Sequence, residues 1–240
     1  MSDGTQGWDA GPAARWIAEA IATGNPLAPL PAELVPPTLE DAQAVAVAVL
    51  DELSLVACGV RLMLRPSAPA IAGPMIDGRL LPRGATVALE SLRHPVVTGA
   101  VIGVLAEALD PEEDTAPRFA ALHPAIDVSA TRFGEPAVDA LQLVADLARL
   151  GLVVPGRAKR LEPGTLAIRL GAPGSRRRGD ACDLAAALAA AAEAARRFGG
   201  LPAGALLVVA GLTPPLPEAA MSGPIIASLG ALGRAEAILA

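Results

Sequence analysis

The sequence is poor in the side chains that most often perform catalysis or bind metals. It contains no tyrosine, two cysteines, two histidines and a single lysine, Lys159. Cys58 and Cys182 lack the paired spacing that a zinc site or a disulfide framework requires. We therefore expect two buried free thiols among apolar neighbours and a cytoplasmic protein. The polar segment Met1–Trp8 has no basic region followed by an apolar stretch, so no signal peptide is expected.

Basic residues are also in deficit. Lysine and arginine total 19 against 25 acidic residues, which gives a formal net charge of −6 and an isoelectric point near 5.0. This balance argues against a nucleic-acid partner, since no basic face is expected to outweigh it. The one basic run, Arg176-Arg177-Arg178, is typical of a solvated hairpin tip.

No apolar run is long enough to cross a membrane, although the mean hydropathy is +0.47. The richest helical stretch, Asp183 to Arg197, spans about 15 residues where about 20 are needed. We expect it to be a packed helix, with Asp180 or Asp183 as its N-cap, and we expect no membrane partner.

Aromatic residues make up only 2% of a chain that is 52% hydrophobic, so alanine, valine, leucine and isoleucine must fill the core. With 240 residues the chain can bury a sizeable core. Its 24 glycines and 23 prolines indicate many turns, which argues against a helical bundle.

Two helices are predicted near the start of the chain. Residues 10–24 show helical periodicity, with Trp16, Ile17, Ala20 and Ile21 on one face. A proline-rich linker follows. Thr38-Leu39-Glu40-Asp41 resembles a capping box and predicts a second helix through about Leu53.

From Val56 onward the pattern changes to short apolar runs separated by glycine and proline, which is typical of strands. These runs are 59–64, 79–89, 96–105, 125–131, 150–154, 165–170 and 205–212. We therefore predict an α+β protein with a small N-terminal helical region, residues 1–55, and a β-rich domain, residues 56–240, that is curled like a roll or barrel.

The order of several motifs resembles that of the 2-keto-4-pentenoate hydratases, within the fumarylacetoacetate hydrolase superfamily. The resemblance is distributed over roughly residues 12–239 and lies in the shared order of its pieces. Those pieces are Pro36–Ala42, Gly59-Val60-Arg61-Leu62, Gly73-Pro74-Met75-Ile76, Leu81–Ala85, Pro124-Ala125-Ile126-Asp127 and Gly211-Leu212-Thr213. The resemblance implies a fumarylacetoacetate-hydrolase-like fold and a small 2-keto or enol carboxylic acid as ligand.

The metal site that the resemblance implies is incomplete. The family holds magnesium or manganese with a Glu-x-Glu pair and one further acidic residue, and this chain has Thr98, Ala100 and Asp127 at those positions. A hard divalent cation needs anionic oxygen ligands, which neither Thr98 nor Ala100 supplies. We expect no tightly bound metal; Asp127 alone leaves room only for weak magnesium or manganese binding.

Other positions give candidates for substrate binding and proton transfer. Arg61 replaces the family's lysine and can bind a carboxylate with its planar guanidinium, and Thr213 stands where the family places a hydroxyl near the substrate. Arg65 and Arg132 are further candidates for holding an anionic substrate. His123, assisted by Asp127, has a suitable pKa range for a general base. A surface or strand-start histidine without a partner is the alternative.

Three functional interpretations remain open at this stage. The first is an enzyme acting on a small 2-keto or enol acid without the family's metal. The second is a non-catalytic homologue that binds such an acid or serves as a partner subunit of an active enzyme. The third is an ordinary hydratase whose ligands come from Glu90, Glu107 or Asp110. With only 18% charged residues available to solvate the surface, we also expect a homo-oligomer, or a hetero-oligomer with an active homologue.

Overall fold

The computed structural model describes residues 8–135, 138–175 and 179–240. Most of the N-terminal segment Met1–Trp8 and the run Arg176–Arg178 therefore lie outside the described residues. Among the described residues, no helix combines the length and apolar character needed to cross a membrane.

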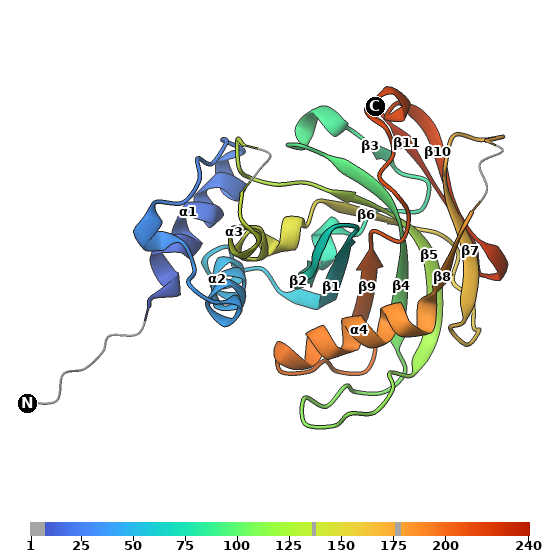
Figure 1. Cartoon of the computed structure of the whole chain (residues 1–240), viewed down its shortest axis with the longest axis horizontal. Helices are drawn as coiled ribbons and strands as arrows, with labels where there is room; N and C mark the ends of the chain where they lie inside the picture. The colour runs from blue at the N-terminus through green and yellow to red at the C-terminus, as the bar shows by residue number, and fades with distance from the viewer. Residues whose placement is uncertain (1–7, 136–137, 176–178) are drawn as a thin grey trace, which may run out of the picture.

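Two sheets and four α-helices form the fold, and the predicted α+β class is confirmed (Figure 1). The α-helices are α1 (Ala10–Thr23), α2 (Leu39–Glu52), α3 (Ala140–Ala145) and α4 (Leu184–Arg197). The six-stranded sheet has the order β2 (Ala68–Ile76), β1 (Ala57–Arg65), β9 (Leu206–Ala210), β4 (Val96–Leu105), β5 (Phe119–Ser129) and β6 (Leu152–Pro155). The five-stranded sheet has the order β3 (Thr86–Val87), β11 (Gly233–Leu239), β10 (Gly223–Leu229), β7 (Thr165–Gly171) and β8 (Asp180–Asp183).

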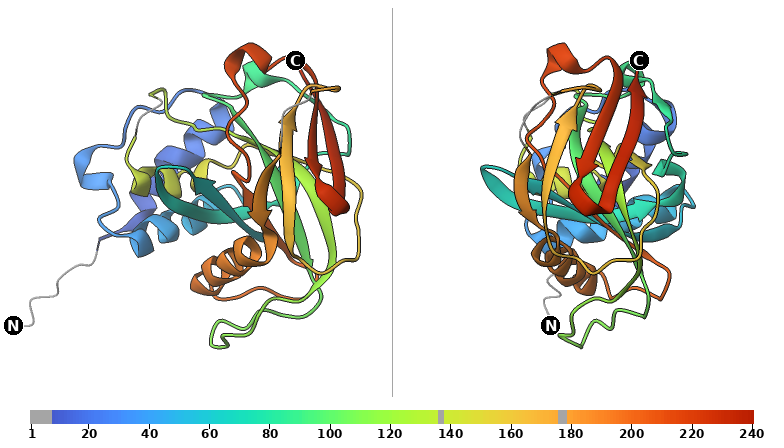
Figure 2. Two further views of the ribbon diagram at one scale, coloured as in Figure 1. Left: turned by 45° about the vertical axis from the view of Figure 1, so that its right-hand side comes forward. Right: turned by 90° about the vertical axis from the view of Figure 1, so that its right-hand side faces the viewer.

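Both sheets are mixed and remain open, so the fold is a pair of curled sheets and not a closed barrel. In the first sheet β1 and β9 are parallel and the other neighbours are antiparallel. Figure 2 shows the sheets from two further sides, with the β10–β11 pair facing the viewer in the right-hand view. Because strands twist, such sheets wrap around the side chains between them.

The predicted helices form for the reasons that the sequence gives. The Thr38 hydroxyl accepts a hydrogen bond from the Asp41 amide at 3.1 Å and lies 2.6 Å from the Asp41 carboxylate, which caps α2. Asp183 caps α4 by accepting from two amides of its first turn. Of the residues expected to share one face of α1, Ile17 and Ala20 are buried, while the side chain of Trp16 is 47% exposed.

Two large cores lie on opposite faces of the six-stranded sheet, and a smaller cluster joins α2 and α3 to β1 and β2. One fills the space between this sheet, the five-stranded sheet and α4. The other lies between the sheet and the helices α1 and α2, and it includes residues of the turn after α3. In Figure 1 the first three helices gather at one end of the molecule, beyond β1 and β2. The predicted boundary at residue 55 falls just before β1, and the division into two domains stays a prediction.

Candidate functional site

The structure brings the four positions singled out by the resemblance onto one face of the six-stranded sheet. Thr98 on β4 lies directly opposite Asp127 on β5, and Ala100 follows two residues later on the same face. Val60 and Leu62, on either side of Arg61, pack in the core between the two sheets. Arg61 on β1 therefore points to the helix side, where it reaches Asp127.

Arg61 and Asp127 form a buried two-pronged ion pair. The Arg61 Nε lies 2.7 Å from Asp127 Oδ1, and its Nη2 lies 2.7 Å from Oδ2. The two side chains are 1% and 0% exposed. Charge-assisted pairs with this parallel geometry are among the strongest side-chain hydrogen bonds. Both carboxylate oxygens of Asp127 are thus engaged by the guanidinium.

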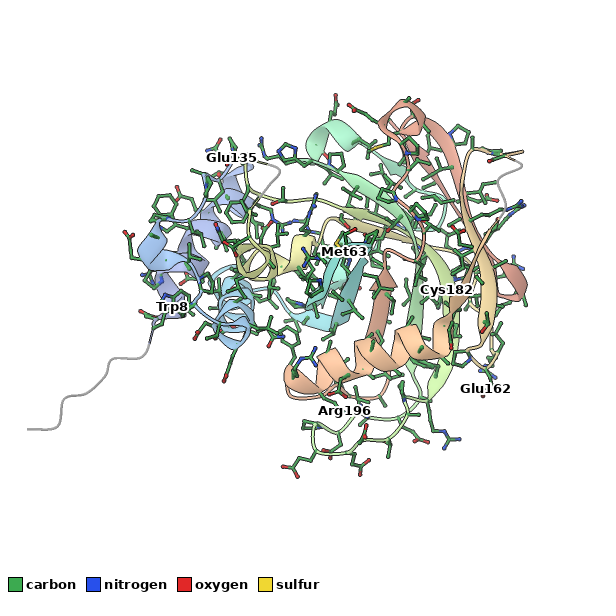
Figure 3. The ribbon with its side chains drawn as sticks, viewed as in Figure 1. Trp8, Met63, Glu135, Glu162, Cys182 and Arg196 are labelled. Atoms are coloured by element: carbon green, nitrogen blue, oxygen red, sulfur yellow. The ribbon has the colours of Figure 1, made fainter. Side chains whose placement is uncertain are left out.

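Two further acceptors complete the coordination of the guanidinium. Arg61 Nη2 also donates to the Ser129 hydroxyl at 2.7 Å, and Nη1 donates to the Ala148 carbonyl at 2.8 Å. The Ser129 hydroxyl in turn lies 2.6 Å from Asp127 Oδ2 and contacts the sulfur of Met63 at 3.6 Å. Figure 3 labels Met63, which lies on β1 two residues after Arg61. Every nitrogen of the guanidinium has an acceptor.

The Ala148 carbonyl is presented by an unusual turn after α3. Leu147, Ala148 and Arg149 all have left-handed backbone angles, with φ of 52°, 50° and 59°. Such conformations cost roughly 1–3 kcal/mol for a residue other than glycine. Gly73 on β2 lies against this turn: a Cβ on Gly73 would meet Ala148 Cβ and the Leu147 carbonyl carbon at 3.0 Å. A missing side chain on β2 therefore makes room for the strained turn.

Neither the turn nor Ser129 was identified from the sequence. Ser129 had a usable signal, since it follows Asp127 by two residues on the same strand face. The turn had none, because Leu147, Ala148 and Arg149 are residue types that rarely adopt left-handed angles.

The residues present do not fit a magnesium or manganese ion. The Thr98 hydroxyl accepts a hydrogen bond from the Gly211 amide at 3.0 Å, and Ala100 has no side-chain donor atom. Asp127 is paired with a cation already. In the part of the chain that the structure describes, no group of three or more histidine, cysteine, aspartate or glutamate side chains lies close enough together to hold a metal. No chemical step through a metal follows from this arrangement.

His123 does not pair with Asp127 as the sequence suggested. The two residues lie four apart on β5, which separates them by about 13 Å along the strand. His123 Nδ1 lies 3.2 Å from the Gly156 carbonyl, while Asp127 is held by Arg61 and Ser129. A general base assisted by Asp127 is therefore not formed.

Thr213 lies on the other side of β4 from Thr98. Its hydroxyl accepts a hydrogen bond from the Gly99 amide at 2.9 Å. A Cβ on Gly99 would meet the Thr213 methyl group at 2.9 Å. Because neighbouring residues of a strand face opposite sides, Thr213 is placed away from the Arg61–Asp127 pair. Its contact with the Gly99 amide supports the bend after β9.

Three acidic residues that were alternative metal ligands are exposed and do not join Asp127. Glu90 lies in the loop before β4, while Glu107 and Asp110 lie in the loop after it. Glu107 pairs with Arg118 at 3.2 Å on the surface.

Arg132 takes part in a second buried ion pair close to the first. It contacts the fully buried Asp146, whose other carboxylate oxygen accepts from Thr131 at 2.8 Å. Burial raises the pKa of Asp146, and the neighbouring Arg132 opposes this shift. Arg65, by contrast, donates to the Pro69 carbonyl in its own hairpin, away from both pairs.

No protein-family model matches the sequence, and no curated protein shows significant sequence similarity to it. Solved structures are more informative. 4-Oxalocrotonate decarboxylase from Pseudomonas putida G7, complexed with magnesium and adipate, superposes with a TM-score of 0.74 at 19% identity over 95% of this chain and 96% of the other.

More distant similarity extends to two other kinds of enzyme. 2-Hydroxyhepta-2,4-diene-1,7-dioate isomerase from Mycobacterium marinum gives a TM-score of 0.55 at 13% identity over 77% and 75% of the two chains. Fumarylpyruvate hydrolase from Pseudomonas aeruginosa, in complex with Mn²⁺ and pyruvate, gives 0.51 at 13% over 75% and 87%. At these identities the similarity is one of fold, and the chain has the fumarylacetoacetate-hydrolase-like fold.

Proposed function

We propose that this chain is a divergent relative of the 2-keto-4-pentenoate hydratases that binds a small 2-keto or enol carboxylic acid without the family's divalent metal. The observation that carries the proposal is the buried Arg61–Asp127 pair, in which a guanidinium engages both oxygens of the remaining carboxylate. The fold supports the ligand class, because the structural neighbours include a decarboxylase, an isomerase and a hydrolase named for acids of this kind.

The positive charge of Arg61 takes the place of the charge of the divalent metal ion. A divalent ion beside Asp127 would lose the field of two further carboxylates, and it would face the repulsion of the guanidinium at short range in a poorly hydrated environment. Arg61 supplies a positive charge to Asp127 from within the chain, so no metal ion has to lose its water shell. The pair therefore favours a protein from which metal-assisted hydration has been lost.

The same contacts argue against catalysis by this pair. Four of the five N–H groups of Arg61 already donate to acceptors within the protein, and both oxygens of Asp127 accept hydrogen bonds. His123 lies too far along β5 to work with either side chain. The sequence interpretation of Arg61 as a substrate-binding residue and of His123 with Asp127 as catalytic groups would require the ion pair to open.

Metal analysis of the purified protein tests the proposal. After dialysis against magnesium and manganese, with and without pyruvate, we expect far less than one bound ion per chain. Hydration of 2-hydroxypenta-2,4-dienoate should show no dependence on added magnesium. Stoichiometric metal, or strong magnesium-dependent hydratase activity, would contradict the proposal.

Restoring the missing carboxylates gives a sharper test. In Thr98→Glu/Ala100→Glu/Arg61→Lys, the smaller lysine head leaves space and the two glutamates supply anionic oxygens. We expect this variant to bind magnesium measurably in a calorimetric titration. The matched control, Thr98→Gln/Ala100→Gln/Arg61→Lys, has the same shapes without the charges and should bind none. If the triple variant with the two glutamates folds but has no affinity for magnesium, these positions are wrongly assigned as metal ligands.

A further inference from the structure

A hollow of about 250 Å³ lies on the surface where the end of α1 meets the segment before β4, the segment after β5 and Gly151, which precedes β6. Its lining includes three arginines from three separate segments, and we call it the arginine hollow. The three arginines are Arg79, Arg93 and Arg132, and Asn25 and Glu90 also belong to the lining. Arg61 and Asp127 are not in this lining, so the hollow is a separate place from the ion pair.

Two of the three arginines are already held in position by the protein. Arg132 is paired with Asp146 and donates to the Leu150 carbonyl at 2.6 Å. Arg93 donates to the Gly24 carbonyl at 3.2 Å, at the end of α1. Their guanidinium groups are fixed before any ligand arrives, and this lowers the entropy cost of binding.

Arg79 differs from the other two. Among the residues that the structure describes, its guanidinium has no hydrogen-bond acceptor and no ion-pair partner. It is partly buried, and its pKa is lowered first by desolvation and then by repulsion from Arg132. A partly desolvated cation next to another cation is an unfavourable arrangement, which a bound anion would relieve.

The surroundings add positive charge and a hydrogen-bond donor. Arg149 is not part of the lining, but it is close enough to Arg132 for the two charges to repel. It donates to the His94 carbonyl, and its buried Nε has no partner among the described residues. Asn25, an exposed residue at the end of α1, also belongs to the lining. Glu90 is the one acidic residue in the lining, and its side chain is exposed to solvent.

We infer that the arginine hollow binds a small oxyanion, an organic carboxylate or a phosphate group, with Arg79 as its principal ligand and Arg93 and Arg132 as supporting charges. A guanidinium presents parallel N–H donors that match the oxygens of both groups. The volume lies below the range of about 300–1,000 Å³ that is usual for drug-sized ligands, and it suits a compact acid. This inference goes beyond the proposed function and needs neither the loss of metal nor any property of the Arg61–Asp127 pair.

Calorimetric titration of the full chain tests the inference with two probes, succinate and inorganic phosphate, in a low-chloride buffer that contains neither. We expect saturable binding of at least one probe, and the probe that binds identifies the kind of anion. Arg79→Gln should weaken that binding by about 10- to 100-fold, the range expected for the loss of a charge-assisted hydrogen bond. The melting temperature of the variant without ligand should be unchanged or higher, because a like-charge contact is removed.

The matched control is Arg118→Gln, which removes the same charge from an exposed side chain in the loop before β5. It should bind the probe as tightly as the unmodified protein. Binding that is absent in the unmodified protein, unchanged in Arg79→Gln, or weakened equally by both variants would overturn the inference. If Arg79→Gln fails to fold, Arg93→Gln replaces it, with the same expected weakening and the same contrary outcomes.

Discussion

At the residue scale, Arg61 is the centre of the buried polar cluster. Lysine and arginine carry the same charge, but a guanidinium is planar and offers donors in a fixed fork. At this position the fork matches Asp127 and has further donors for Ser129 and Ala148. As a result, each of the three guanidinium nitrogens has at least one acceptor within the protein.

Removing one partner of this pair should be costly. Arg61→Met leaves Asp127 buried without a counter-charge, and we expect a loss of about 3–5 kcal/mol in the free energy of unfolding. Urea denaturation followed by circular dichroism measures it. The double variant Arg61→Met/Asp127→Leu removes both charges and should recover most of the loss. A neutral effect of Arg61→Met would show that Asp127 does not depend on the guanidinium.

The two cysteines make a second residue-scale prediction. Burial raises the thiol pKa of Cys58 above its ordinary value of 9.0, with Asp77 adding to the shift, and burial together with Asp183 does the same for Cys182. A raised pKa means less thiolate at a given pH, so alkylation by iodoacetamide at pH 8 should be slower than for a free thiol. The rate should continue to rise above pH 9. The protein unfolded in guanidinium chloride is the control; equal rates in both states would refute the prediction.

At the scale of elements, proline and glycine decide where strands can lie. The strand β2 contains Pro69 and Pro74 and was not expected from the sequence. It forms because it is an edge strand, where a missing backbone donor costs little. The apolar run 79–89 was expected to be a strand, and only Thr86–Val87 forms one, while Leu80 makes a single isolated bridge to Val153. Short runs of this kind acquire a partner only through the tertiary fold.

Gly59 is required by the parallel pairing of β1 with β9, which also positions Arg61. A Cβ at residue 59 would lie 2.0 Å from the Leu206 carbonyl oxygen. Gly59→Ala should therefore force the strands apart and lower the free energy of unfolding by about 1–3 kcal/mol or more. Gly78→Ala is the matched control, because a Cβ there meets nothing within 4 Å. Equal unfolding midpoints in urea would contradict the close approach.

At the scale of the whole molecule, the exposed apolar side chains are unevenly distributed. Among the described residues, six large hydrophobic side chains are exposed, and five of them belong to α1, α2 and the segment before β1. They are Trp16, Leu39, Val47, Leu55 and Val56, with Val56 82% exposed. Where such side chains form one contiguous patch, the patch often marks a protein contact.

We predict that the chain assembles with itself or with a related subunit through this helical region. Light scattering at micromolar concentration should give a mass above the 24.1 kDa of one chain. Replacing Trp16 and Val47 with glutamine should shift the mass towards the monomer, because both side chains are already solvent-exposed and their loss should spare the fold. A clean monomer for the unmodified chain would exclude self-assembly, and co-purification with a homologue would then test the alternative.

The sequence by itself determined the main helices and most strands of the six-stranded sheet, because helix caps and apolar periodicity act over a few residues. It also placed Arg61, Thr98, Ala100 and Asp127 together through the order of the motifs. Only the tertiary structure decided that Arg61 closes on Asp127, that Thr213 lies on the opposite face of β4, and that His123 stands apart. These outcomes depend on sheet register and on contacts between residues 33 to 114 positions apart, which local patterns do not encode.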